Sequence, residues 1–307
     1  MASVTLAESA KLSQDLLITG IIENIVTVNP IYELMPFMEI DGNALGYNRE
    51  NALGDVQFLG LGGTITAKAA ATFTAVTSSL TTLLGDAEIN GLIEATRSDK
   101  QSQTGAQVAS KAKSIARQYQ DTMVNGDGTS NTFSGLAALV PAGQKINSAA
   151  AAGSNLSFDT LDQLIDAVKD KDGQVDFIMM PSRTRRSYFA LLRALGGANM
   201  SETMALPSGR RVPTYRDVPI FVNDWIPLTQ TQGTSSSICN SIYAGTFDDG
   251  SGKHGISGLT AKGNAGIRIE NVGTMEARDE KIIRVKFYCG FANFSQLGIA
   301  AAVGNLN

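Results

Sequence analysis

The alternation of apolar and polar positions between residues 98 and 141 predicts one long amphipathic helix followed by a tight reversal of the chain. Apolar residues recur there at intervals of three and four, and they are Val108, Ala112, Ile115, Tyr119 and Met123. This spacing puts them on one face of a helix, which we expect over residues 101–124 with a length of about 36 Å. Ser98 and Gln101 have the spacing of a capping box at its start.

A glycine-rich turn is expected to end this helix. It consists of Asn125, Gly126, Asp127, Gly128 and Thr129. Glycine adopts left-handed backbone conformations that close helices, so we expect Gly126 or Gly128 to have a positive φ. The chain then re-enters an apolar segment at Gly135. We therefore predict a structural turn made by residues 125–129 together with Gly135.

The long polar-faced helix, the Gly-Asp-Gly-Thr turn and the short return "FSGLAALVP" resemble one known arrangement. It is the spine helix and following turn of tailed-phage major capsid proteins of the Hong Kong 97 type. The resemblance implies an α+β capsid fold with an N-terminal arm, an extended β-hairpin loop, a peripheral domain containing the spine helix, and an α/β axial domain. It places the arm at 1–37, the extended loop at 38–75, the peripheral domain at 76–141, the axial domain at 142–264 and the return strands of the peripheral domain at 265–307.

The N-terminal segment carries several apolar residues, which are Leu16, Leu17, Ile18, Ile21, Ile22, Ile25 and Val26. Two interpretations stay open for it. Either it is a helix packed on its own domain, or it is an arm that buries this face on a neighbouring subunit, as the resemblance implies.

Residues 44–49 and 71–76 alternate β-branched or aromatic with polar positions, which predicts a hairpin with a mobile, glycine-rich tip. A two-stranded ribbon is poorly stable alone and needs another surface. The resemblance implies that this surface is an adjacent subunit. Gly60, Gly62 and Gly63 do not complete a GxGxxG motif, and no strand-to-helix context surrounds them, so a dinucleotide site is not expected.

Further along, the pattern predicts that residues 76–83 continue the return strand and that residues 86–96 form a short helix with Asp86 at its cap. The alanine-rich residues 142–156 predict a linker between subdomains. Ser157 is expected to cap the helix that follows.

Helix and strand then alternate, as in an α/β unit. Ser182 is expected to cap a second helix, and the inward residues of that helix are Tyr188, Phe189, Leu192 and Leu195. Strands are expected at 175–180, 218–223 and 241–247, and in the last third at 265–272, 281–291 and 297–303. In the longest of these, apolar residues alternate with charged ones, which is typical of a sheet with one solvated face.

Composition and charge narrow the function. The net charge of −4 argues against a dedicated nucleic-acid binder, which would carry a basic patch. Cys239 and Cys289 are far apart and lack metal-ligand spacing, so we expect reduced, buried thiols. We see no signal peptide and no apolar run near the ~20 residues that span a bilayer. We therefore expect synthesis and assembly in the host cytoplasm, without a membrane.

No set of residues in the sequence predicts a catalytic, cofactor or metal site. His254 is the single histidine and has no oriented nucleophile near it in sequence. The turn residues Asn125, Asp127, Thr129 and Asn131 lack the order of a calcium loop and its final glutamate. The segment "GLTAKGN" does not have the spacing of a P-loop. We therefore do not expect an enzyme.

Two arginine groups remain, and they are Arg183, Arg185, Arg186 and Arg193, and Arg210, Arg211 and Arg216. One interpretation is a solvated surface. The other is ion pairing between subunits with acidic runs such as Asp248 and Asp249, or Glu276, Asp279 and Glu280, because such pairs set register and partner choice.

The resemblance implies a major capsid protein of a tailed double-stranded-DNA bacteriophage, assembling as hexamers and pentamers into an icosahedral virion shell. Its implied partners are copies of itself, a separate scaffolding protein, a portal, a decoration protein and packaged DNA bound without sequence specificity. The alternative that shares this fold is an encapsulin-like bacterial nanocompartment shell.

Overall fold

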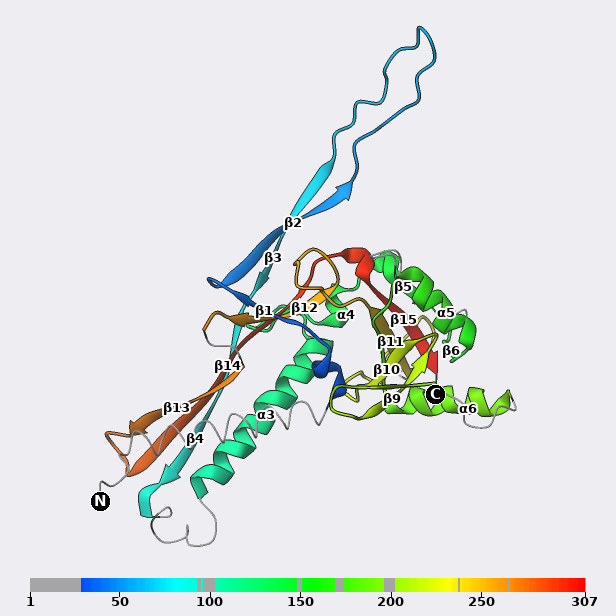
Figure 1. The fold of residues 1–307 in the computed structure, drawn as a ribbon. Helices are drawn as coiled ribbons and strands as arrows, with labels where there is room; N and C mark the ends of the chain where they lie inside the picture. Colours follow the sequence, from blue (N-terminus) through cyan, green and yellow to red (C-terminus); the bar gives the residue numbers. More distant parts are fainter. Residues whose placement is uncertain are drawn as a thin grey trace.

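The computed structural model describes residues 29–92, 95, 103–147, 151–168, 174–195, 202–236, 238–263 and 266–306. Figure 1 shows an elongated sheet with a long helix against it, a second lobe of mixed helix and strand, and a hairpin that projects away from both. The apolar set expected in the arm and the capping-box pair lie outside the described residues.

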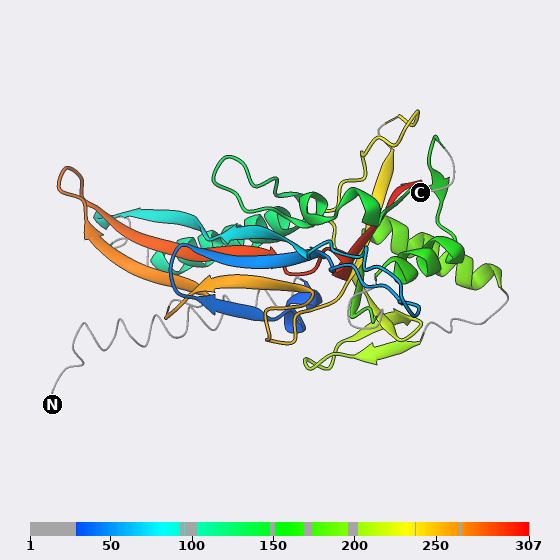
Figure 2. The ribbon, with the colours of Figure 1, turned by 90° about the horizontal axis from the view of Figure 1, so that it is seen from above.

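The first sheet has five strands and carries the long helix. Its order is β1 (Phe37–Ile40), β12 (Ile256–Ala261), β14 (Glu280–Asn293) and β13 (Ile267–Thr274), and β4 (Thr81–Asn90) pairs with β14 as well. The predicted spine helix is observed as α3 (Gln103–Asn125), which packs on β4 and β14. Figure 2, which views the molecule from above, shows how β4, β14 and β13 run together along this part of the molecule.

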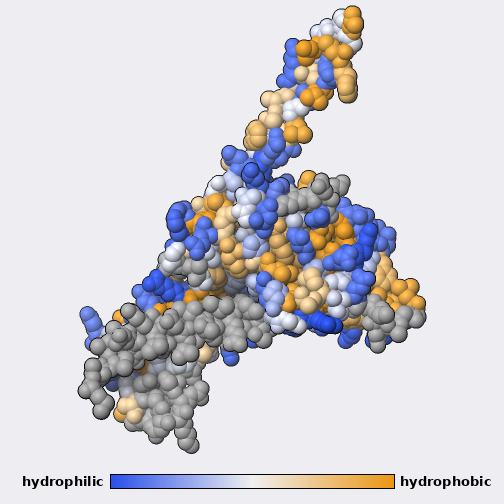
Figure 3. Space-filling model, in the orientation of Figure 1, coloured by the Kyte–Doolittle hydropathy of each residue, from blue (hydrophilic) through white to orange (hydrophobic). Residues whose placement is uncertain are grey.

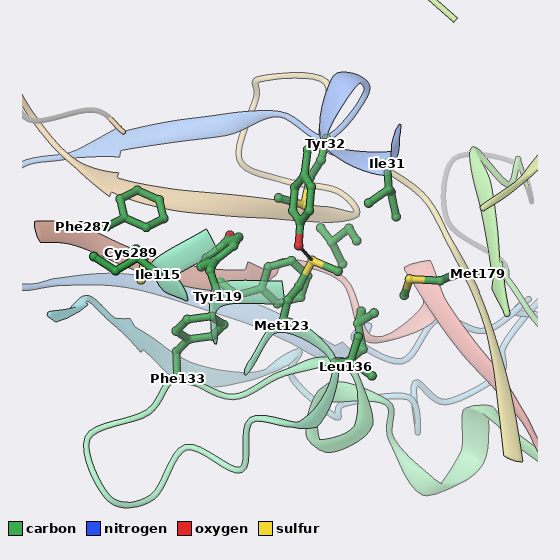
Figure 4. Packing of buried hydrophobic residues seen from close by; sticks show 14 of the residues in the cluster. Ile31, Tyr32, Ile115, Tyr119, Met123, Phe133, Leu136, Met179, Phe287 and Cys289 are labelled. Atoms are coloured by element: carbon green, nitrogen blue, oxygen red, sulfur yellow. Dashed lines mark hydrogen bonds between the residues drawn. The ribbon is translucent and has the colours of Figure 1, made fainter. Parts of the chain in front are cut away.

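The apolar face predicted for α3 is confirmed, because all five of its residues are buried: Val108, Ala112, Ile115, Tyr119 and Met123. Tyr119 is the centre of an aromatic cluster (Figure 4), with ring centroids 5.9 Å from Tyr32, 5.6 Å from Phe133 and 5.3 Å from Phe287. Tyr32 belongs to the short 3-10 helix η1 (Pro30–Glu33). Ile31, Tyr32 and Met35, near the end of the expected arm, are therefore buried in the core of their own subunit.

The second sheet has eight strands. Its order is β5 (Lys145–Asn147), β15 (Ile299–Leu306), β11 (Cys239–Gly245), β7 (Phe177–Met180), β10 (Val218–Val222), β9 (Arg211–Tyr215) and β8 (Thr203–Ala205), and β6 (Ser154–Asn155) also pairs with β15. Residues of α5 (Phe158–Ala167) and Tyr188 of α6 (Ser182–Ala194) pack in one apolar cluster with one face of this sheet. The other face joins the core around α3. Two short helices, α4 (Leu136–Leu139) and η2 (Ala142–Gln144), precede β5, and a third, η4 (Gln296–Gly298), precedes β15.

Two predictions made from local sequence are wrong, in whole or in part, because strand pairing determines the structure of those segments. The helix expected over 86–96 is wrong at its start, because Asp86 to Asn90 belong to β4 and pair with β14. Ala87 and Ile89 are buried while Glu88 between them is exposed, which is the period of a strand. The expected linker at 142–156 is also wrong in part, because β5 and β6 within it pair with β15.

The first helix of the α/β lobe begins as predicted, whereas the second differs from its prediction at both ends. Ser157 caps α5 as expected, accepting a hydrogen bond from the backbone of Thr160. Ser182, in contrast, is the first helical residue of α6, and Pro181 occupies the cap position without a side-chain hydrogen bond. Leu195 was expected to point inward, but 71% of its surface is exposed.

The strand assignments also cross the expected domain boundaries. β15 lies in the eight-stranded sheet between β5 and β11, and not with β13 and β14 as the return strands of the peripheral domain. β12 and β1 lie in the five-stranded sheet, although the boundaries put the first in the axial domain and most of the second in the extended loop. The chain therefore leaves the second lobe before β12 and returns to it for its last strand.

Candidate assembly surfaces

The hairpin predicted around residues 38–75 is largely exposed to solvent. It is formed by β2 (Ala44–Ala52) and β3 (Thr72–Ser79), which pair from Ala44 opposite Ser79 to Ala52 opposite Thr72. The hairpin leaves the five-stranded sheet at the single residue between β3 and β4, and it projects beyond the rest of the molecule (Figure 1).

Two side chains of β2 attach the root of the hairpin to the end of β14. The hydroxyl of Tyr47 donates a 2.8 Å hydrogen bond to the carbonyl oxygen of Asn293. Nε of Arg49 donates a 3.1 Å hydrogen bond to the carbonyl oxygen of Phe294, and its Nη2 donates to that of Asn293. The rings of Tyr47 and Phe294 meet edge to face at 5.2 Å. The hairpin therefore leaves the subunit in a fixed direction.

In the tip of the hairpin, residues 53–71, several hydrogen bonds converge on one glutamine. Oε1 of Gln57 accepts hydrogen bonds from the backbone of Thr66 at 2.9 Å and of Ala67 at 2.7 Å, and its Nε2 donates to the carbonyl of Thr64 at 3.1 Å. These bonds join the outgoing and returning chains across the tip. They make no connection to the rest of the subunit.

The tip presents apolar side chains to solvent. Its exposed apolar residues are Leu53, Val56, Phe58, Leu59, Leu61 and Ile65. Phe58 and Leu61 have relative exposures of 107% and 112%, so they touch almost nothing in their own chain. Figure 3 shows this apolar surface at the far end of the hairpin. Contiguous exposed apolar surface of this kind marks a site of contact with another molecule.

The predicted turn follows α3 directly. The side chain of Asn125 donates to the carbonyl of Trp225 at 2.9 Å, which attaches the end of α3 to the loop after β10. Asp127 pairs with Ser134 in an isolated antiparallel bridge. The turn therefore connects the long helix to the second lobe.

Only one of the two candidate glycines has the expected conformation. Gly128 has φ of +75°, whereas Gly126 is not in the positive-φ region. Ser130 and Asn131 also have positive φ values of 51° and 63°. Gly126 is required for a different reason, because a Cβ there would lie 2.2 Å from the carbonyl oxygen of Phe133.

The carboxylate of Asp127 is occupied by the turn itself. It accepts hydrogen bonds from the backbone of Thr129 at 2.9 Å, from the hydroxyl of Thr129 at 2.6 Å and from the hydroxyl of Thr132 at 3.1 Å. These donors, with the Thr129 hydroxyl first, lower the pKa of Asp127 below its ordinary value. The carboxylate of Asp127 thus stabilises the backbone conformation of the turn.

The remaining candidates do not gather into a reactive site. Within the described residues, no group of three or more histidine, cysteine or acidic side chains is placed to hold a metal ion. Cys239 and Cys289 are separate, buried thiols, and burial raises the pKa of Cys289 to about 12. No helix in the described part of the chain is long and apolar enough to cross a membrane.

The arginines and the acidic residues considered as their partners differ in the contacts that they make within the subunit. Arg216 pairs with Asp162 at 3.0 Å, within its own subunit. Asp248 is buried and accepts a hydrogen bond from the backbone of Gly252, so it serves its own loop. Glu280 lies 3.8 Å from Arg278. Arg185, Arg186 and Arg193 lie along α6.

Sequence reasoning missed two features of the hairpin. The sequence pattern predicts Tyr47 and Arg49 only as members of a strand, although their alternate spacing puts both on one side of β2. The tip was described by its glycines, although its apolar residues recur through the same segment. A count of apolar residues in the tip would have found the second feature.

Comparisons with known proteins identify a matching family and several solved structures of similar fold. A family model described as the phage capsid family matches residues 12–250. A search of curated proteins finds no match. A solved SrpI encapsulin complex from Synechococcus elongatus is similar at 16% identity and a TM-score of 0.70, covering 90% of this chain and 87% of that one.

Two further solved structures share the fold. The capsid of a native GTA particle matches at 12% identity and a TM-score of 0.67, over 90% of this chain and 89% of that one. The capsid of cyanophage A-1(L) matches at 10% identity and a TM-score of 0.68, over 91% of this chain and 93% of that one. Identities this low establish similarity of fold alone.

Proposed function

Because the chain belongs to the phage capsid family, it is a structural shell-forming protein, and we propose that it is the major capsid protein of a tailed double-stranded-DNA bacteriophage. Its copies assemble as hexamers and pentamers into an icosahedral shell in the host cytoplasm. Scaffolding protein, portal and decoration protein are its expected partners, and packaged DNA is enclosed without sequence-specific contacts.

The observation that carries this proposal is the hairpin tip. Phe58 and Leu61 are fully exposed at the end of a projecting loop, and exposed apolar surface of this kind marks a contact with another molecule. A subunit that lays this loop on the next copy buries the apolar surface and gains roughly 25 cal/mol for each Å² removed from water. Repetition in a closed lattice then turns many weak contacts into a stable particle.

The first test is assembly of the purified protein, alone and with a scaffolding partner. We expect closed shells, or capsomers that convert to them, in electron micrographs and in size-exclusion chromatography. A monomer or dimer that persists under all of these conditions would contradict the proposal.

The second test removes the apolar tip without touching the sheets. Deletion of residues 56–68, or Phe58→Ser combined with Leu61→Ser, is expected to leave the unfolding midpoint of the subunit nearly unchanged and to abolish particles. Lys68→Ser in the same exposed loop is the matched control and should still assemble. Unfolding of the subunit after the deletion would instead assign the tip to the intramolecular core.

A second candidate function is an encapsulin-like compartment that encloses protein cargo. It is favoured by the similarity of fold to the SrpI encapsulin complex, which has the highest TM-score of the structures described above. Analysis of the contents of particles isolated from the native source distinguishes the two. Double-stranded DNA supports the phage capsid, and a protein cargo without DNA supports the compartment.

A further inference from the structure

The two helices of the eight-stranded sheet carry opposite charge. α5 has the sequence FDTLDQLIDA, with three aspartates and no lysine or arginine. α6 has the sequence SRTRRSYFALLRA, with four arginines and no acidic residue. Figure 1 shows the two helices at two different borders of the lobe, at the end of the molecule far from β13 and β4.

Among the described residues of the subunit, α5 and α6 are joined by aromatic contacts and not by their charges. Phe158, Tyr188 and Tyr215 form an aromatic cluster at the two helices, with Phe158 at 6.3 Å from Tyr188 and 5.9 Å from Tyr215. Asp162 of α5 pairs with β9 and the residue after it, accepting from the Tyr215 hydroxyl at 2.7 Å and from Arg216 at 3.0 Å. None of the ion pairs among the described residues joins α5 to α6.

Some of the charges on each helix form no ion pair within the described residues and are available to another molecule. Among the described residues, Asp166 of α5 makes no ion pair, and Asp159 accepts a hydrogen bond from Gln163 of its own helix. On α6, Arg185, Arg186 and Arg193 form no ion pair within the described part of the chain.

The surface of α6 also has the shape of a contact site. Arg185, Arg186 and Arg193 line a hollow together with Phe189 and Leu192. Apolar side chains with cations beside them are typical of the contact surfaces between proteins, where arginine and aromatic residues are enriched. Leu195, beyond the end of the helix, adds a largely exposed apolar side chain.

We infer that α6 of one copy docks against α5 of the next copy, head to tail around the axis of a capsomer. This inference rests on the proposed shell function. A ring closes through heterologous contacts, in which one border of a subunit meets a different border of its neighbour. An acidic border and a basic border on one subunit meet this requirement, because each copy attracts the next and repels a neighbour in the reversed orientation.

A nucleic acid is a weaker candidate for the arginines of α6. A nucleic-acid surface combines a basic patch with little competing negative charge, whereas α5 on the same lobe is acidic throughout and the whole chain has a net charge of −4. A contact to DNA would also leave the acidic border without a function. The experiment below therefore distinguishes binding of DNA by α6 from docking of α6 on another copy.

The test reverses the net charge of each helix separately. The basic-α5 variant is Asp159→Lys, Gln163→Lys and Asp166→Lys, which leaves Asp162 paired with Arg216 and changes the three negative charges of the helix into three positive ones beside Asp162. The acidic-α6 variant is Arg185→Glu, Arg186→Glu and Arg193→Glu, which leaves Arg183 as the remaining cation of the helix among three carboxylates. Both subunits should keep the unfolding midpoint of the unaltered protein.

Each variant alone places like charges at every boundary, so we expect capsomer and shell yield to fall by about tenfold or more. Mixing the two variants in equal amounts should restore six-membered rings, because alternating copies then present opposite charges at every boundary. Native mass spectrometry of the rings should show three copies of each variant. A contact within one subunit cannot be rescued by mixing.

The outcomes separate this inference from the function on which it rests. If the unaltered protein forms no shells, the proposed function fails. If it assembles and both variants assemble equally well, or if the mixture restores nothing, the contact between α5 and α6 is overturned. Shells of the acidic-α6 variant that form normally but hold less nucleic acid would assign α6 to DNA and overturn it as well.

A milder pair guards against loss of folding in the reversed variants. Arg185→Gln with Arg186→Gln removes the cations without adding repulsion. Assembly of the unaltered protein should slow as salt rises from 50 to 500 mM, since screening weakens exposed charge contacts. The neutral variant should lose most of this salt dependence, and an unchanged dependence would contradict the inference.

Discussion

The backbone N–H of Gly135 donates a 2.8 Å hydrogen bond to the carbonyl oxygen of Gly126, and this bond closes the chain reversal between α3 and α4. Neither glycine has room for a side chain. A Cβ on Gly126 would lie 2.2 Å from the carbonyl oxygen of Phe133, and a Cβ on Gly135 would lie 2.4 Å from that of Thr122. Two stretches of backbone thus touch directly where the chain passes from α3 to the second lobe.

Gly126→Val is expected to destabilise the subunit by about 2–3 kcal/mol, because the new side chain must displace backbone rather than a flexible side chain. Denaturant unfolding measures this change. Gly143→Ala is the matched control, since a Cβ at Gly143 meets nothing within 4 Å and its φ is not positive. Equal midpoints for the two variants would show that the contact at Gly126 relaxes without cost.

Asp127→Asn is expected to have a much smaller effect than Gly126→Val on the thermal midpoint and on particle yield. The amide oxygen of asparagine still accepts from the backbone of Thr129, although the bond from the Thr129 hydroxyl to the second oxygen is weakened. A metal or catalytic site, in contrast, would need the carboxylate. If Asp127→Asn abolished particles while Gly126→Val had no effect, the interpretation that this turn acts through its backbone conformation would be wrong.

Asp86 and Arg284 face each other across β4 and β14, with Nε of Arg284 donating to Oδ1 and Nη2 to Oδ2, each at 2.8 Å. These bonds lower the pKa of Asp86 below its ordinary value of 3.8. The ionised form therefore favours folding above about pH 4, and this contribution is lost as the pH falls through the lowered pKa. Asp86→Asn should lower the midpoint by about 1–3 °C at pH 7.

The pH dependence gives the control for this pair. The difference between Asp86→Asn and the unaltered protein should shrink as the pH falls from 7 through the lowered pKa of Asp86, because the protonated carboxyl is then as neutral as the asparagine amide. Midpoints followed by circular dichroism across this range measure it. A difference that stays constant with pH would mean that shape, rather than charge, is responsible.

Arg49→Ala is expected to loosen the hairpin while leaving the two sheets folded. The substitution removes the bonds to the carbonyls of Asn293 and Phe294, which hold β2 against the end of β14. Amide hydrogen exchange should rise in β2 and β3 and stay constant in β11, and shell yield should fall. Glu50→Ala, at the next and exposed position of β2, serves as the control. Unchanged exchange in β2 would show that Tyr47 holds the root alone.

Several features follow from the sequence because they depend on neighbours in the chain. The intervals from Val108 to Met123 predicted the buried face of α3, and the glycines after Asn125 predicted where the helix ends. The alternation from Ile283 to Cys289 predicted a strand with one buried face, observed in β14. The resemblance drawn from the turn and its surroundings is confirmed by the match to the phage capsid family.

Other features were decided by the tertiary structure, because they depend on which distant segments meet. Ala87 and Ile89 suit a helix or a strand until β14 pairs beside them. β15 reads like its predecessors in sequence, but its pairing with β11 puts it in the other sheet. Gly126 is needed because the carbonyl of Phe133 folds back onto it, and no local pattern contains that approach. Periodicity fixes what one element buries, whereas pairing and close contact fix which element it is buried against.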